Sequence, residues 1–144
     1  MKRVFVIGGY TSKSHYRKYM KIARNLQKNY HVVTLMDQVD VVYESDWKRW
    51  SAYCRKDLSE INCCDYVVAY LPGSVAYTNV AFLAGYAIAK GKPLFVVISE
   101  KVANSIDVVC SSTGTLLYDR TFGENKTVIL EDYIGSHQIG KGLV

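Results

Sequence analysis

The stretch from residue 66 to residue 98, YVVAYLPGSVAYTNVAFLAGYAIAKGKPLFVVI, decides the fold class of this chain. It begins and ends with short apolar runs, 66–71 and 94–98, which are typical of strands buried on both faces. A Pro-Gly pair at 72–73 ends the first run, and apolar residues at helical spacing predict a helix over 79–90. Strands that are apolar on both faces and alternate with helices indicate a parallel sheet between two helical layers.

The same alternation continues on both sides of this stretch. Further strands are predicted at 3–8, 30–36, 116–118 and 128–130, and further helices at 14–28, 47–61 and 102–111. We therefore expect one three-layer α/β domain over residues 1–134, with a mainly parallel five-stranded sheet of flavodoxin-like or Rossmann-like topology, and a flexible tail over 135–144. Ligands of such sheets bind beyond the carboxyl ends of the strands, where the strand order reverses.

Composition excludes several classes of protein. The chain has 144 residues, of which 49% are hydrophobic and 22% charged, so neither a disordered nor a collagen-like chain is expected. No apolar run approaches the ~20 residues of a membrane span, and the N-terminal MKRVFVIGGY predicts a first strand rather than a signal peptide. Four cysteines without a CxxC pair and three scattered histidines give no zinc spacing. A cytoplasmic protein with reduced thiols, without metal or cofactor, is the expectation.

The net charge of +5 is unevenly distributed. Residues 1–36 contain eight Lys or Arg and no acid, whereas the rest of the chain has a net charge of −3. At helical spacing, five of these cations share one face: Lys13, Arg17, Lys21, Arg24 and Lys28. The face is either merely solvated or attracts a phosphorylated ligand or an acidic partner. A nucleic-acid partner is not expected, because no aromatic residues for base stacking accompany the cations.

A glycine pair, Gly8-Gly9, follows the first predicted strand and precedes the first predicted helix. Glycines at this place let a ligand approach the backbone, and a helix N-terminus favours an anion. A tight turn without a ligand explains the pair equally well, since the sequence contains neither GxGxxG nor a Walker pattern.

The order of features now becomes specific to a family. It consists of a glycine turn after the first strand, Asp57-Leu58, Ile61, Asp65, the strand 66–71, Pro72, and Leu83-Ala84-Gly85-Tyr86-Ala87 followed by Gly91-Lys92-Pro93. This order resembles the nucleoside 2-deoxyribosyltransferase family and its nucleotide N-glycosidase relatives. The resemblance covers about residues 3–110 and is clearest over 57–98.

The resemblance implies a chemistry that this sequence departs from. Family members use a glutamate that attacks the anomeric carbon and forms a glycosyl-enzyme intermediate. That position falls on Leu83, and the acid that assists proton transfer falls near Tyr77. A helical aspartate that contacts the sugar or base region falls on Asp57, which is the candidate catalytic residue here. Asn104 is similar to an asparagine that completes a neighbouring subunit's site, and family members commonly form homo-oligomers.

The predicted pocket is lined by Gly8, Gly9, Tyr10, Asp57, Gly73, Tyr77, Asn79 and Leu83, with Asn104 as a further ligand-binding candidate. The glycines offer backbone approach, and the two tyrosines could stack on a base. Asp57 could accept a sugar hydroxyl, and Asn79 could join helix N-terminal amides in holding a phosphate.

Three functions stay open at this point. The first is a protein that binds a nucleoside or nucleotide but has lost glycosyl transfer. The second is an active N-glycosidic-bond hydrolase or deoxyribosyltransferase with a relocated acid, for which Glu44, Asp46 and Glu100 are available. The third is an interaction protein that uses the basic helical face.

Overall fold

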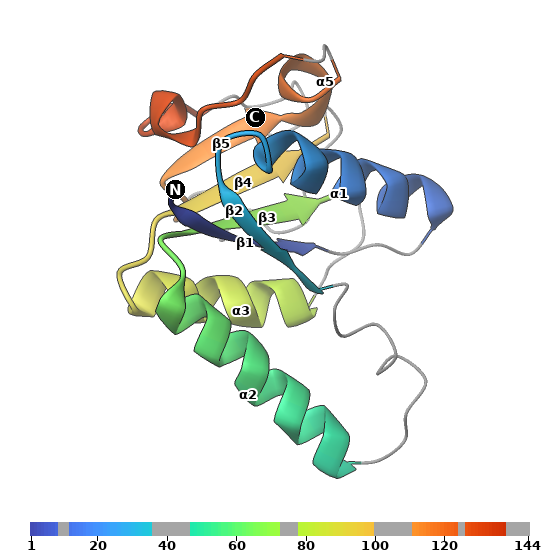
Figure 1. The fold of residues 1–144 in the computed structure, drawn as a ribbon, viewed down its shortest axis with the longest axis vertical. Coiled ribbons are helices and arrows are strands. Elements are labelled where there is room, and N and C mark those ends of the chain that lie inside the picture. The colour runs from blue at the N-terminus through green and yellow to red at the C-terminus, as the bar shows by residue number, and fades with distance from the viewer. Residues whose placement is uncertain (9–11, 36–46, 73–77, 100–110, 124–125, 138–144) are drawn as a thin grey trace.

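A five-stranded, all-parallel sheet with the order β2-β1-β3-β4-β5 is the centre of the fold (Figure 1). The computed structural model describes residues 1–8, 12–35, 47–72, 78–99, 111–123 and 126–137. The strands are β1 (Arg3–Gly8), β2 (His31–Thr34), β3 (Tyr66–Leu71), β4 (Leu94–Ile98) and β5 (Gly114–Leu117). The helices are α1 (Lys13–Leu26), α2 (Trp47–Cys63), α3 (Thr78–Ala89), α5 (Tyr118–Thr121) and the 3₁₀ helix η2 (Leu130–Tyr133). This strand order is the flavodoxin-like one and confirms the predicted three-layer α/β class.

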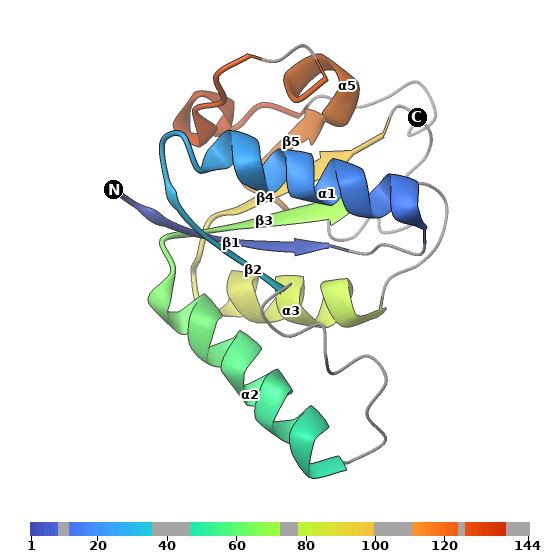
Figure 2. The same ribbon diagram turned by 45° about the vertical axis from the view of Figure 1, so that its right-hand side comes forward.

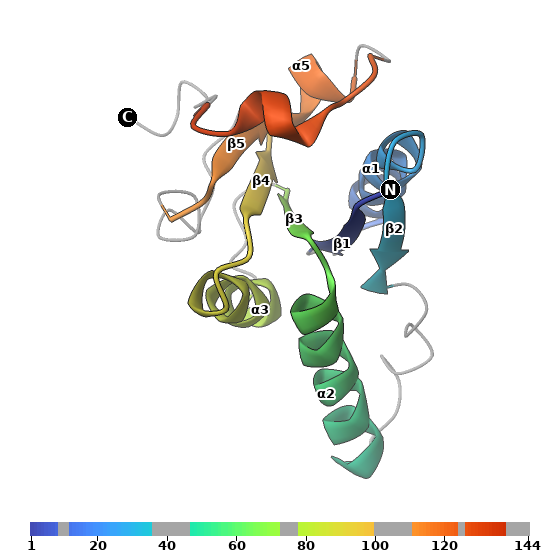
Figure 3. The same cartoon turned by 60° about the vertical axis from the view of Figure 1, so that its left-hand side comes forward.

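Helices cover both faces of the sheet. Helices α2 and α3 lie on one face, and α1 lies on the other together with the C-terminal segment that contains α5 and η2 (Figures 1 and 3). Successive side chains of β1 alternate between the two layers, since Val4 and Val6 pack toward α1 whereas Phe5 and Ile7 pack toward α3. No helix within the described ranges has the length and apolar character needed to cross a bilayer.

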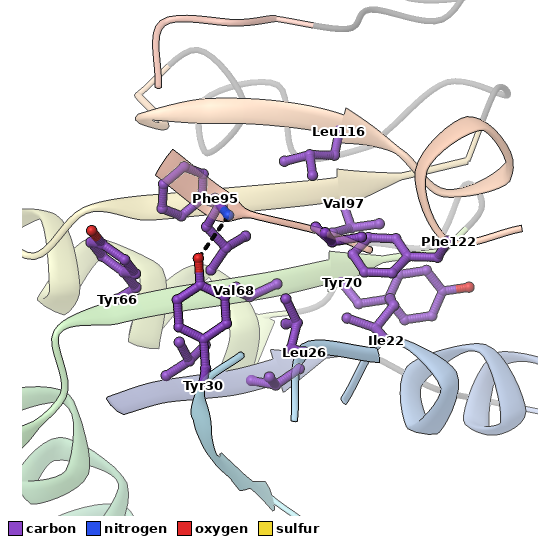
Figure 4. Packing of buried hydrophobic residues seen from close by; sticks show 14 of the residues in the cluster. Ile22, Leu26, Tyr30, Tyr66, Val68, Tyr70, Phe95, Val97, Leu116 and Phe122 are labelled. Atoms are coloured by element: carbon purple, nitrogen blue, oxygen red, sulfur yellow. Dashed lines mark hydrogen bonds between the residues drawn. The ribbon is translucent and has the colours of Figure 1, made fainter. Parts of the chain in front are cut away.

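Aromatic rings fill the layer between the sheet and α1 (Figure 4). The Tyr30 hydroxyl donates to Glu131 Oε2 (2.5 Å) and accepts from the Leu130 amide (2.8 Å). Burial, reinforced by the bond to Glu131, raises the pKa of Tyr30 well above its ordinary value. Asn25 Nδ2 donates to the Lys126 carbonyl (2.8 Å), so the C-terminal segment is fixed at two points near the end of α1.

The C-terminal part differs from its prediction. The prediction of a strand at 128–130 is wrong. Val128 and Leu130 pack into the core between the sheet and α1, and Leu130 begins η2. The strand expected at 116–118 begins at Gly114 instead, and Tyr118 belongs to α5. Residues 135–137 are bonded to β5, through Gly135 N to Thr113 O (2.9 Å) and Thr115 N to Ser136 O (2.8 Å). All but the last residue of the helix predicted at 102–111, and the rest of the tail, 138–144, lie outside the described residues.

Candidate functional site

The reversal of strand order occurs between β1 and β3. Strand β1 pairs with β2 on one side and β3 on the other, and Gly8 at its carboxyl end is in register with Tyr70. Helices α1, α2 and α3 all begin at this carboxyl end of the sheet, as Figure 2 shows for α1 and α3. The topology therefore places the candidate site beyond β1 and β3, where the sequence predicted it.

Gly8 is glycine for an internal packing reason. A Cβ atom there would lie 2.8 Å from Cδ2 of the Tyr19 ring and 3.3 Å from Tyr70 Cβ. The Tyr19 ring is held in place because its hydroxyl donates to Val6 O (2.6 Å) and accepts from Leu35 N (3.0 Å). The structure thus explains Gly8 by the space that the Tyr19 ring needs. The predicted role of Gly8 in ligand approach stays a prediction.

Leu83 lies in the apolar layer between α3 and the sheet. Its side chain is 5% exposed and belongs to the same core cluster as Phe5, Ile7 and Val80. Helix α3, whose sequence is TNVAFLAGYAIA, contains no acidic residue. The position that the resemblance assigns to the nucleophile is therefore part of the core, and no carboxylate of α3 replaces it.

Asp57 is half-buried in α2, and its Oδ1 atom is shielded from solvent. Helices α2 and α3 both run away from the carboxyl end of the sheet, and they are joined where Asn62 Nδ2 donates to the Tyr86 hydroxyl (2.9 Å). Asp57 and Leu83 both precede this junction in their helices. The candidate catalytic aspartate and Leu83 thus lie on the same face of the sheet. In its own helix, each lies between the N-terminus and the Asn62–Tyr86 contact.

Asn79 is exposed in the first turn of α3. Within the described ranges, the first turns of α1, α2 and α3 contain no acidic residue, and the positive end of a helix dipole favours an anion. The role of Asn79 in holding a phosphate stays a prediction.

His15 is a residue of this region that the sequence reasoning missed. It lies in the first turn of α1, which Ser12 caps by accepting from the His15 amide (3.2 Å). The His15 Nδ1 atom is shielded from solvent and has no hydrogen-bond partner among the described residues. The available signal was Ser12, a favoured N-cap residue, because a helix that begins there has His15 in its first turn.

The remaining predicted site residues lie outside the described part of the chain. They are Gly9, Tyr10, Gly73, Tyr77 and Asn104, together with the alternative acids Glu44, Asp46 and Glu100. Their roles stay predictions.

The structure describes three of the four cysteines. Cys54 and Cys63 are free and exposed on α2, whereas Cys64 is buried, and burial raises its thiol pKa to about 11. A thiol with so high a pKa is a poor nucleophile near neutral pH. Within the described residues, no three His, Cys, Asp or Glu side chains come together as a metal site would require.

Comparison with solved structures identifies the fold. A 2-deoxyribosyltransferase from Bacillus psychrosaccharolyticus matches with a TM-score of 0.74 and 15% identity, over 92% of this chain and 96% of that one. A 2-deoxyribosyltransferase from Leishmania mexicana matches with a TM-score of 0.53 and 19% identity, over 69% of this chain and 65% of that one. A CMP N-glycosidase from Clostridium botulinum matches with a TM-score of 0.53 and 18% identity, over 82% and 90%. No family model and no curated protein sequence matches the chain. The chain therefore has the fold of 2-deoxyribosyltransferases and of a CMP N-glycosidase, as the order of its motifs implied.

Proposed function

We propose that this protein binds a nucleoside or nucleotide at the carboxyl end of the sheet and does not carry out covalent glycosyl transfer. The observation that carries the proposal is the position of Leu83, which lies in the apolar core at the place that the resemblance assigns to the nucleophile. The proteins with the same fold support the ligand class, because they are named for a deoxyribosyl group and for CMP.

The chemical argument concerns the bond that would form. In the covalent mechanism, a carboxylate oxygen attacks the anomeric carbon while the bond from that carbon to the base breaks, and the base leaves as it is protonated. Leucine has no lone pair to donate to carbon and no charge to stabilise an oxocarbenium ion. With leucine at this position, the protein lacks the group that the first step requires.

Each other predicted residue has a binding role in this proposal. Asp57 accepts a hydrogen bond from a sugar hydroxyl, and Asn79 and the first amides of α3 hold a phosphate. The backbone of Gly8, Gly9 and Gly73 lets the ligand approach closely. Tyr10 and Tyr77 stack on the base, and Asn104 contacts the ligand bound by a neighbouring copy.

The test is a thermal-shift screen with deoxynucleosides, ribonucleosides and their 5′-monophosphates, with chromatographic detection of free base in the same samples. We expect at least one compound to raise the Tm by several degrees without release of base, since a ligand at 100 times its Kd stabilises the native state by about 2.7 kcal/mol. The Asp57→Asn variant should bind that compound about tenfold more weakly, because a hydrogen bond to a charged acceptor is lost.

Asp119→Asn is the matched control, because Asp119 is exposed on α5, on the opposite face of the sheet. It should leave the Tm shift unchanged. A screen in which no compound raises the Tm contradicts the binding proposal. Release of free base that Asp57→Asn abolishes contradicts the loss of chemistry, and it establishes the alternative of an active N-glycosidase or deoxyribosyltransferase with a relocated acid.

We also propose that the protein is a homo-oligomer that associates through the outer face of α3. This face presents Phe82, 60% exposed, and Ile88, 39% exposed, beside the exposed Gly85. No charged residue occurs between Thr78 and Ala89. A helix that is apolar all round is usually buried on all sides, which favours a partner on this face.

Phe82→Lys is therefore expected to shift the protein toward the monomer. The substitution places a charge in the centre of the proposed contact, and sedimentation velocity measures the change. Ile134→Lys is the control, because Ile134 is also exposed, at 57%, but lies in the C-terminal segment. A wild-type protein that sediments as a monomer, or an oligomer that both substitutions leave intact, would contradict this interface.

We place the protein in the cytoplasm. The support is that Cys54 and Cys63 are free and exposed, a state that a reducing compartment maintains.

A further inference from the structure

The outer face of α1 carries a line of cations, here called the α1 stripe, that the proposed nucleotide site does not use. Its members are Lys13, Arg17, Lys21, Arg24 and Lys28. Spacings of three and four residues align the first four opposite the buried side chains Tyr19, Ile22 and Leu26, and Lys28 continues the line in the turn that follows α1. At 1.5 Å per residue the stripe is about 22 Å long. It lies on the far side of the sheet from α2 and α3, and hence from Asp57 and Leu83 (Figures 2 and 3).

The stripe has no counter-charge in the described part of the chain. None of its members forms an ion pair with a described residue, whereas Arg3 forms one with Glu60 at 2.7 Å. Lys18, next to the stripe, does have an internal contact, because its Nζ lies 5.3 Å from the centre of the Tyr118 ring. Of the stripe cations, Arg24 also lies close enough to Tyr118 for its charge to act on the phenol, and the other four have no such contact among the described residues.

The stripe is also unfavourable for the isolated helix. Like charges three or four residues apart destabilise a helix by about 0.2–0.5 kcal/mol per pair, and the stripe contains three such successive pairs within α1. Lys13 and Arg17 lie near the positive end of the α1 dipole, where acids are preferred, and α1 has no acid in its first turn. The fold does not require cations here, because this face makes no core contact. A ligand of opposite charge would offset the repulsion between the cations of the stripe.

A shallow hollow of about 190 Å³ lies on the stripe between Lys21, Arg24, Asn25 and Lys28. Its floor is fixed, because Asn25 is 6% exposed and donates to the Lys126 carbonyl. The guanidinium fork of Arg24 and two lysine side chains around a fixed floor suit a carboxylate group.

We infer that the α1 stripe is a docking surface for an acidic protein segment whose carboxylates recur about every 6 Å, as at i and i+4 of a helix. Charge complementarity along about 22 Å carries this inference. A protein segment fits better than a nucleic acid, because the stripe follows a convex helix surface and α1 offers one half-exposed ring, Tyr16, beside it rather than a stacking platform. The inference is independent of the proposed nucleotide site.

The experiment uses the full chain and a fluorescein-labelled helical peptide with glutamates at i and i+4, followed by fluorescence anisotropy. A single-stranded oligonucleotide of equal net charge and phosphatidylserine vesicles are tested alongside. We expect the Arg17→Glu/Arg24→Glu variant to bind the peptide at least about tenfold more weakly than the wild type, and we expect 0.5 M NaCl to weaken wild-type binding, since exposed charges are screened at about that ionic strength.

Lys56→Glu/Lys90→Glu changes the net charge by the same amount on the α2 and α3 side, where both lysines are exposed. It should alter the peptide Kd by less than about twofold. An equal loss in both variants shows attraction to net charge only and overturns the proposal, as does wild-type protein that fails to bind the peptide. Tighter binding of the oligonucleotide or vesicles than of the peptide overturns it in favour of those partners. Should the double glutamate variant lose its folded circular dichroism signal, Arg17→Gln/Arg24→Gln repeats the test without new charges.

Discussion

The Leu83→Glu variant is expected to lose about 3 kcal/mol or more of its free energy of unfolding. The substitution removes packing between α3 and the sheet and places an ionisable group among Phe5, Ile7 and Val80, at a position that is 5% exposed. Urea-induced unfolding followed by circular dichroism measures the loss. The loss should shrink at low pH, because burial raises the pKa of the introduced carboxyl group, so that the native state favours its protonated form.

Leu83→Met is the control for this position. It conserves volume and apolar character, so it should cost less than about 1.5 kcal/mol. The result that would contradict a core role is a Leu83→Glu protein that keeps wild-type stability and releases free base from a deoxynucleoside. That outcome would show that position 83 faces a ligand pocket and that a carboxylate there is sufficient to restore glycosyl chemistry.

Gly114→Ala is expected to lower the free energy of unfolding by about 2–3 kcal/mol. Its new Cβ atom would lie 2.2 Å from the Tyr133 carbonyl oxygen, a backbone atom that cannot rotate away. Either β5 or η2 must therefore shift, and both are held by neighbouring contacts. Thermal unfolding measures the loss, and faster amide hydrogen exchange over 126–137 would locate the strain.

Gly85→Ala makes the same chemical change with the opposite expected sign. The added Cβ atom meets no atom within 4 Å, and the position lies inside α3. Alanine in a helix interior is favoured over glycine by about 0.5–1 kcal/mol, so this variant should be more stable than the wild type. Equal stability of Gly114→Ala and the wild type would mean that η2 moves away from β5 without cost.

The central sheet was predictable because its signal is local. Strands such as 66–71 and 94–98 are continuous apolar runs, and the helices between them have regular spacing and clear ends. Burial of such a run on both faces follows from its composition, whereas the register between neighbouring strands does not. The predicted and observed bounds of β3 and β4 accordingly coincide.

The C-terminal part was not predictable in the same way, because contacts distant in sequence determine it. Val128–Leu130 has strand-like composition, but Leu130 is held by the Tyr30 hydroxyl, 100 positions earlier in the chain. At helical spacing Tyr16 shares a face of α1 with Tyr19 and Leu26, yet Tyr16 is 36% exposed, whereas Ile22 is fully buried. Helical spacing predicts which residues share a face of the helix, but it does not predict which residues at the border of that face are buried. The packing against the sheet determines this.

The candidate site shows the same division. Topology alone predicts that a ligand would bind beyond the carboxyl ends of β1 and β3, but Leu83, predicted to line that pocket, lies in the apolar core. The reason for Gly8 was not visible in the sequence, since it depends on the Tyr19 ring eleven residues later. The apolar surroundings of Leu83 likewise could not be seen in its own segment, because they include side chains of strands β1, β3 and β4.

The bonds between β5 and residues 135–137 have a consequence for how copies of this protein can meet. An outermost strand with free amides and carbonyls is a template for strand addition by another chain, which leads to continuous intermolecular sheets. Here Thr113 O and Thr115 N are already bonded to Gly135 and Ser136, and Thr115 forms a parallel bridge with His137. At the opposite border, β2 is only four residues long. Addition of a strand from another chain beside Thr113 and Thr115 would therefore have to displace the bonds that residues 135–137 already make there, so the C-terminal segment protects this part of the β5 edge.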